Sequence, residues 1–104
     1  MSNSPTQMSM KLLREEGYLV AVVEKWHQFA RIRQDLFGFI DLLAIRKDEI
    51  LGVQVTSASN MSARRNKIAD HDNIGPVRES GMRLELHGWE KKGNRWQVKR
   101  EDIS

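Results

Sequence analysis

The 104-residue sequence contains no cysteine, which excludes disulfide bonds and cysteine-ligated zinc. It also has no apolar run close to the roughly 20 residues that a membrane-spanning helix needs. Its first residues are polar and lack the basic-then-apolar layout of a signal peptide. We therefore expect a cytoplasmic protein without membrane contacts, with one domain over residues 8–104 and a flexible tail over residues 1–7.

Positive charge is concentrated in the second half of the chain. Residues 1–60 carry seven Lys or Arg and seven Asp or Glu, whereas residues 61–100 carry ten and five. A basic surface of this kind suits a polyanion, so DNA is the expected partner. An ordinary solvated surface would have the same composition, and charge alone does not separate the two interpretations.

The spacing of apolar residues predicts an α/β domain with the element order α-β-β-β-α-β-β. Residues 26–38 are expected to form an irregular connection, and residues 47–49 a turn short enough to make an antiparallel hairpin. We expect a mixed central sheet flanked by helices. The expected elements are helices over 8–16 and 62–69, a helical turn from Pro76 to Gly81, and strands over 18–23, 39–45, 50–56, 82–89 and 95–99.

The strongest chemical signal is an acid within an apolar strand. Asp41 follows Gly38-Phe39-Ile40, and a charge in such a place is costly unless it is paired or bound to metal. Asp41 and Gln54 are equally distant from the turn between the second and third strands, so they become cross-strand neighbours around a possible cation site. Thr56 shares a face with Gln54, because strand side chains alternate with period two.

This arrangement resembles the PD-(D/E)XK nuclease superfamily, where an aspartate on the second core strand precedes Glu-X-Lys or Asp-X-Lys on the third. The resemblance covers roughly residues 8–90, on Asp41 and Gln54-Val55-Thr56 together with the element order. It is strongest to small phage and bacterial stand-alone domains of the VRR-NUC or Holliday-junction-resolvase type. It implies a restriction-endonuclease-like core, a Mg²⁺ or Mn²⁺ cofactor held by Asp41, and DNA endonuclease activity.

Two residues depart from the superfamily pattern. Gln54 stands where the second acid is expected, although its carbonyl oxygen can still ligate a cation. Thr56 stands where the lysine is expected and cannot supply its charge. Glu24 is the candidate for a further metal-binding acid, and Lys67 or Arg33 for the missing catalytic cation.

Basic residues on either side of the motif are candidates for nucleic-acid binding. For each candidate a structural role is the alternative: a salt-bridged Asp41, a Glu24 paired with Lys25, or a Thr56 chosen for strand propensity. The histidines show no metal-ligand spacing and are expected to be structural, and the tryptophans to lie in the core or an interface. The nucleic-acid-binding candidates are Arg31, Arg33, Arg64, Arg65 and Lys67.

Two functions remain open on this evidence. One is a magnesium-dependent endonuclease with a rearranged site. The other is an inactive nuclease-fold module, of phage origin, that binds nucleic acid or a protein partner. A homodimer is expected in either case, since related small nucleases often act in pairs to cut two strands.

Overall fold

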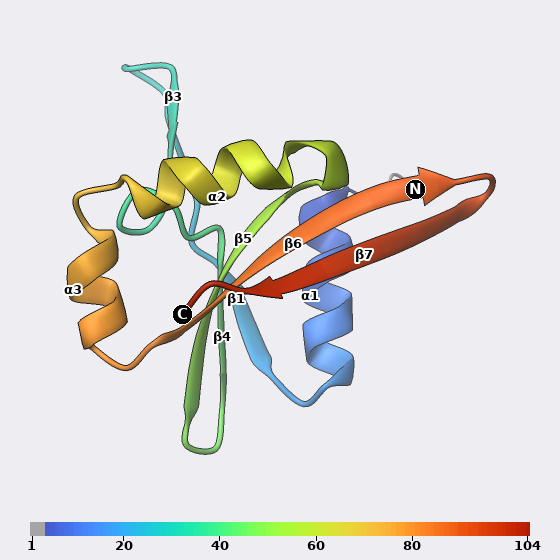
Figure 1. The fold of residues 1–104 in the computed structure, drawn as a ribbon, viewed down its shortest axis with the longest axis horizontal. Coiled ribbons are helices and arrows are strands. Elements are labelled where there is room, and N and C mark those ends of the chain that lie inside the picture. The colour runs from blue at the N-terminus through green and yellow to red at the C-terminus, as the bar shows by residue number, and fades with distance from the viewer. Residues whose placement is uncertain (1–3) are drawn as a thin grey trace.

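The computed structural model of the protein describes residues 4–104. A five-stranded sheet in the order β1-β4-β5-β6-β7 forms its centre, and a separate two-stranded hairpin, β2-β3, projects from it (Figure 1). The helices are α1 (Pro5–Glu15), η1 (Ala58–Asn60, a 3₁₀ turn), α2 (Met61–Ala69) and α3 (Ile74–Glu79). The strands are β1 (Leu19–Val22), β2 (Lys25–His27), β3 (Ile32–Gln34), β4 (Leu42–Arg46), β5 (Glu49–Ser57), β6 (Arg83–Lys92) and β7 (Arg95–Asp102).

The sheet is mixed. Strands β1, β4 and β5 form an antiparallel meander, and β6 then pairs parallel to β5. Parallel neighbours need a crossover connection, which η1, α2 and α3 provide. Strand β7 returns antiparallel to β6. The predicted class, an α/β domain with a mixed sheet flanked by helices, is confirmed, as is the antiparallel pairing of the strands around the 47–49 turn.

Each face of the sheet has its own apolar core. Helix α1 covers one face, where Leu13 packs with residues from β1, β4 and β5, such as Val20 and Leu51. Helices α2 and α3 cover the other face, where Ile68 and Val77 pack with residues of the 39–40 segment and β6. Two cores on opposite faces explain why central strands such as β5 are buried over most of their length.

The first helix begins earlier than its apolar pattern indicates. It starts at Pro5, and the Ser4 Oγ accepts a hydrogen bond of 3.2 Å from the Gln7 backbone N–H. Serine at the cap and proline in the first turn are typical of a helix start. Residues 5–7, assigned to the tail from sequence, therefore form the first turn of α1. Residues 1–3 of that tail lie outside the described residues.

The largest correction concerns the connection over residues 26–38. It contains the β2-β3 hairpin, in which Trp26 faces Arg33. All residues from 25 to 34 are exposed, so the segment lacks the apolar alternation that would have revealed its strands. Strand β4 also starts later than predicted, which places Asp41 immediately before the strand and not within it. The Asp41 N–H still donates to the Val53 carbonyl at 2.9 Å, continuing the ladder.

Two features of the structure concern membrane contacts and the expected homodimer. Among helices of residues 4–104, none is long and apolar enough to cross a membrane. On the outer part of the sheet, Leu19, Ile45 and Ile50 are cross-strand neighbours with exposed side chains. This apolar row is a surface that the predicted homodimer could use, and the dimer stays a prediction.

Candidate metal and nucleic-acid site

Three carboxylates from separate parts of the chain meet at the base of the β2-β3 hairpin. Glu24, Asp35 and Asp41, here called the acid cluster, each offer an oxygen within 4.8 Å of the other two. Lys25 faces Gln34 in the hairpin, so the next pair towards the sheet is Glu24 and Asp35. The hairpin therefore brings two of the three acids together, and the sheet supplies the third.

A tight loop between Asp35 and Asp41 sets the spacing of these two acids. Leu36 and Ile40 exchange backbone hydrogen bonds of 3.0 Å across it. Gly38 has a φ of 94° and lies so close to the His71 ring that a Cβ there would collide with it. Only glycine meets both conditions, the positive φ and the close approach. The loop is thereby held against the turn that follows α2.

The Asp41 carboxyl is buried, with 4% of its residue surface exposed. Its Oδ2 accepts hydrogen bonds from the Gln54 Nε2 at 2.6 Å and from the Val55 backbone N–H at 2.8 Å. The pKa of Asp41 is raised to about 8, mainly by burial and also by the negative charges of Asp35 and Glu24, against the opposing effect of the Val55 N–H. In the absence of a cation, the site therefore favours the protonated form of Asp41 near neutral pH.

The acid cluster suits a divalent cation. Within residues 4–104, the Asp35 Oδ1 is buried without a hydrogen-bond partner. An unpartnered carboxylate oxygen beside two further acids is unfavourable, and a bound cation would compensate it. All three donors are oxygens, which hard cations such as Mg²⁺ prefer. Glu24, Asp35 and Asp41 could therefore hold a metal ion.

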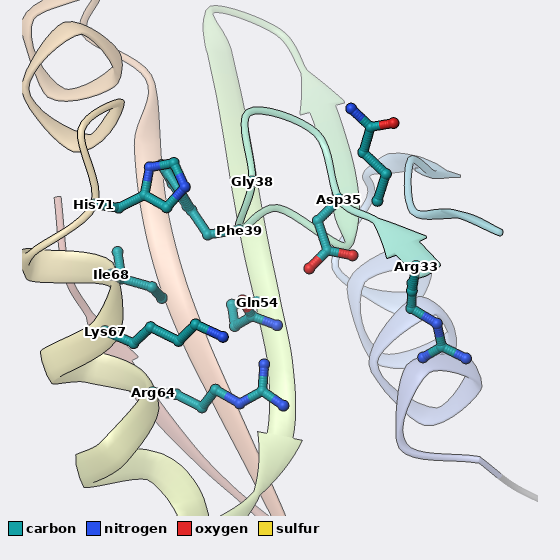
Figure 2. Close-up of a pocket in the computed structure, with 10 residues that line it drawn as sticks. Arg33, Asp35, Gly38, Phe39, Gln54, Arg64, Lys67, Ile68 and His71 are labelled. Atoms are coloured by element: carbon teal, nitrogen blue, oxygen red, sulfur yellow. The ribbon is translucent and has the colours of Figure 1, made fainter. Parts of the chain in front are cut away.

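A cleft of about 340 Å³ opens beside the acid cluster. Figure 2 shows Asp35 on one side of it and the side chains of Arg64 and Lys67 extending from α2 towards Gln54 on the other. Asp35 thus faces two basic side chains across a space open to ligand. The lining residues are Arg33, Gln34, Asp35, Gly38, Phe39, Gln54, Arg64, Lys67, Ile68 and His71.

The structure brings Asp41, Gln54 and Glu24 together, as the sequence indicated. The Gln54 amide, however, does not have the metal-binding role that was expected of its carbonyl oxygen. The predicted convergence of Asp41 and Gln54 is confirmed by their hydrogen bond. Gln54 directs its N–H₂ group at Asp41, so it orients that carboxylate and does not offer its carbonyl to the acid cluster. Thr56 is buried and lines a neighbouring depression, shared with Arg33 and Arg64, and not the cleft itself.

The basic candidates separate into those in the cleft and those outside it. Arg64 and Lys67 line the cleft. Arg65 instead pairs with Glu101, its Nη2 donating to the Glu101 Oε1 at 2.6 Å. Arg33 also lines the cleft and lies 3.7 Å from Glu24, whose expected partner was Lys25.

The remaining candidates lie in less expected places. Arg31 is at the exposed turn of the β2-β3 hairpin, with a φ of 51°. His87 is fully buried and hydrogen-bonded, a structural role as predicted. Trp89 is buried, whereas Trp26 is exposed on the hairpin and not in the core. His71 lines the cleft and its Nδ1 accepts a hydrogen bond from the Asn73 N–H.

Sequence reasoning missed Asp35 as a site residue. It belongs to the segment assigned as an irregular connection, so no strand pairing placed it near Asp41. One signal was present: Asp35 and Asp41 bracket a short stretch containing Gly38, the arrangement of two acids across a tight turn.

No protein-family model matches this chain, and no curated protein matches it significantly. The geometry of the acid cluster and the cleft therefore carries the functional argument.

Proposed function

We propose that the protein is a divalent-cation-dependent nuclease of the PD-(D/E)XK type that hydrolyses DNA phosphodiester bonds. One observation carries the proposal: Asp35, one of the three acids of the cluster, stands opposite Arg64 and Lys67 across a single cleft. Carboxylates that hold a cation, with basic groups beyond them for phosphate, are the parts that phosphodiester hydrolysis requires.

The topology supports this proposal. The superfamily resemblance implies a helix, a three-stranded antiparallel meander, a crossover helix and a strand parallel to the third. Helix α1, strands β1, β4 and β5, the α2-α3 crossover and strand β6 follow that order. Asp41 stands immediately before the second meander strand and Gln54 on the third, at the positions that the two motif acids occupy in that superfamily.

The residues of the site divide the work. Glu24, Asp35 and Asp41 would hold Mg²⁺ or Mn²⁺, which when bound supplies an activated water and stabilises charge on the phosphate. Gln54 and the Val55 N–H fix the orientation of Asp41. These contacts act on the acid and not on the substrate.

The cations of α2 replace the missing motif lysine. Lys67 reaches the cleft from the helix and supplies a compact positive charge near the scissile phosphate, which Thr56 cannot. Arg64, one helical turn earlier, offers a planar fork that binds phosphate through two N–H groups. Lys67 is therefore assigned to charge stabilisation in the transition state, and Arg64 to substrate binding.

The experiment is cleavage of supercoiled plasmid and branched DNA with Mg²⁺ or Mn²⁺. Asp35→Asn and Asp41→Asn should abolish cleavage. Lys67→Ala should lower the rate about 10²- to 10³-fold, as loss of one preorganised donor does, with a much smaller change in DNA affinity. Lys47→Ala, in the exposed β4-β5 turn, is the matched control. Cleavage that persists in Asp41→Asn would refute the proposal.

A binding module without catalysis is the second candidate. It is favoured by Thr56 at the lysine position and by the absence of an acid at position 54. This hypothesis predicts DNA binding that survives Asp41→Asn and no cleavage with any cation. The same variants therefore separate the two functions.

A further inference from the structure

The β2-β3 hairpin is an arm that carries exposed aromatic side chains. It extends beyond the sheet and the helices (Figure 1). Trp26 and Ile32 are mostly exposed and Phe29, at the turn, is fully exposed. Aromatic side chains left in water forgo a large burial free energy, so their clustering on one arm indicates a surface that a partner covers.

The charge of the arm identifies the kind of partner. Residues 25–34 include Lys25, Arg31 and Arg33 and no Asp or Glu. Cations interleaved with aromatic residues match a chain of phosphates and bases, since phosphates attract the cations and base faces stack on the rings.

The arm also leads directly to the acid cluster. Glu24 precedes β2 and Asp35 follows β3, so two of the cluster acids form the base of the arm. Phe29 lies in the turn at the far end of the arm, two residues beyond the end of β2. A nucleic acid that follows the arm to its base would therefore reach the acid cluster.

We propose that the β2-β3 hairpin binds unpaired nucleotides, with Trp26 and Phe29 stacked on bases and Arg31 on phosphate. The substrate class of the adjacent site is then single-stranded or branched DNA and not fully paired duplex. Paired bases are covered by their neighbours and present only edges in the grooves, whereas unpaired bases expose the faces that aromatic rings need. The inference about cleavage rests on the proposed function, and the inference about binding does not.

The test is the DNA affinity of variants, measured by fluorescence anisotropy in EDTA so that no cleavage occurs. The probes are a single-stranded oligonucleotide, a duplex with an unpaired loop, and the fully paired duplex. The Phe29→Ala and Trp26→Ala changes should each weaken binding of the first two about tenfold or more, as loss of a stacked base does, and binding of the duplex less than twofold. Both side chains are exposed, so the fold should persist, which thermal unfolding verifies.

The matched control is Trp96→Ala. Trp96 is also partly exposed on a projecting two-stranded ribbon, formed by β6 and β7, with Lys91 beside its ring. It lies away from the acid cluster, and its removal should leave all three affinities unchanged.

The outcomes separate this inference from the proposed nuclease function. Unchanged affinity for unpaired DNA in Phe29→Ala and Trp26→Ala would overturn it. Equal weakening for all three probes would also overturn it, because that result indicates groove binding to duplex. If these variants lose affinity for unpaired DNA alone, and the unmodified protein does not cleave DNA in Mg²⁺ or Mn²⁺, the proposal for the arm is upheld and the nuclease proposal is refuted.

Discussion

Two polar clusters within residues 4–104 are built in opposite ways. In the first, here called the Ser9 network, the Trp89 Nε1 donates to the Ser9 Oγ at 2.8 Å, and that hydroxyl lies 2.9 Å from the His87 Nδ1. The His87 Nε2 lies 3.0 Å from Glu85, which also accepts from Arg100. Each polar group of this network has a partner, whereas the acid cluster leaves the Asp35 Oδ1 with none among the described residues.

The pKa values of the two clusters shift in opposite directions. The pKa of Glu85 is lowered, first by its hydrogen bond with His87 and also by Arg100. The pKa of Asp41 is raised to about 8, first by burial and then by the neighbouring acids. A satisfied network stabilises the fold, whereas acids with an unpartnered oxygen form a cluster that a bound cation would complete. Ser9 and His87 are fully buried, so their chain of hydrogen bonds serves stability and not catalysis.

The largest expected effect comes from breaking the Ser9 network. Ser9→Ala removes the hydroxyl without adding volume and leaves the Trp89 N–H and the His87 Nδ1 without their partner. Each unsatisfied buried group costs about 1–3 kcal/mol, so the free energy of unfolding should fall by about 2–6 kcal/mol. Urea unfolding at pH 7 measures it.

Ser62→Ala is the control for this change. Ser62 lies on the exposed side of α2, where the substitution should change the free energy of unfolding by less than about 0.7 kcal/mol, the range of ordinary helix propensities. Equal losses in the two variants would mean that the network contributes nothing beyond helix propensity.

A second prediction addresses how the acid cluster is held. Gly38→Ala and Gly81→Ala both place a Cβ at a positive φ, which costs about 1–2 kcal/mol. Only Gly38 also meets the His71 ring, while Gly81 faces open space. Gly38→Ala should therefore be the more destabilising by about 1–3 kcal/mol, the usual cost of overpacking. Thermal unfolding of the pair decides it, and equal melting temperatures would show that the loop is not packed against His71.

The third prediction uses the raised pKa of Asp41. The folded protein favours the protonated carboxyl of Asp41. The contribution of this carboxyl to stability is therefore full below its unfolded pKa of 3.8 and is lost as pH rises through its folded pKa of about 8. Asp41→Asn removes this loss. In EDTA, its stability advantage over the unmodified protein should therefore be larger at pH 9 than at pH 5 by at least about 1.4 kcal/mol, the equivalent of one pKa unit.

Melting temperatures at the two pH values test this prediction. An advantage that is the same at pH 5 and pH 9 would mean that Asp41 titrates normally. The contribution of the Ser9 network to stability should change at acidic pH instead. Because the pKa of Glu85 is lowered in the folded protein, its stabilisation is present above the unfolded value of 4.5 and is lost as pH falls.

The pairing at the centre of the site could be predicted from the sequence, because a short turn determines which residues face each other. The position of the 47–49 turn placed Asp41 opposite Gln54, and the ladder pairs Leu42 with Val53 in the same register. Local geometry of this kind depends on few residues. The direction of the Gln54 amide depends on its surroundings and could not be predicted.

The features that the sequence did not show depend on exposed or distant residues. Asp35 is positioned by a hairpin whose residues are all exposed, so no apolar pattern marked it. Arg65 was grouped with Arg64 and Lys67 as one basic cluster. Arg64 and Lys67 are three residues apart and share a face of α2. Arg65 lies on another face, where it pairs with Glu101 of β7.

The most direct test of cation binding by the acid cluster is a titration with Mn²⁺ at pH 8, in which the melting temperature and the number of bound ions are measured. A cation that binds the folded protein alone raises its stability by mass action, and it must displace the proton of Asp41. We predict that one Mn²⁺ binds per chain and that the melting temperature rises, with a smaller rise at pH 6. Both effects should be lost in Asp35→Asn but not in Glu79→Gln, which changes an exposed acid of α3. No response to Mn²⁺, or an equal response in Asp35→Asn, would contradict it.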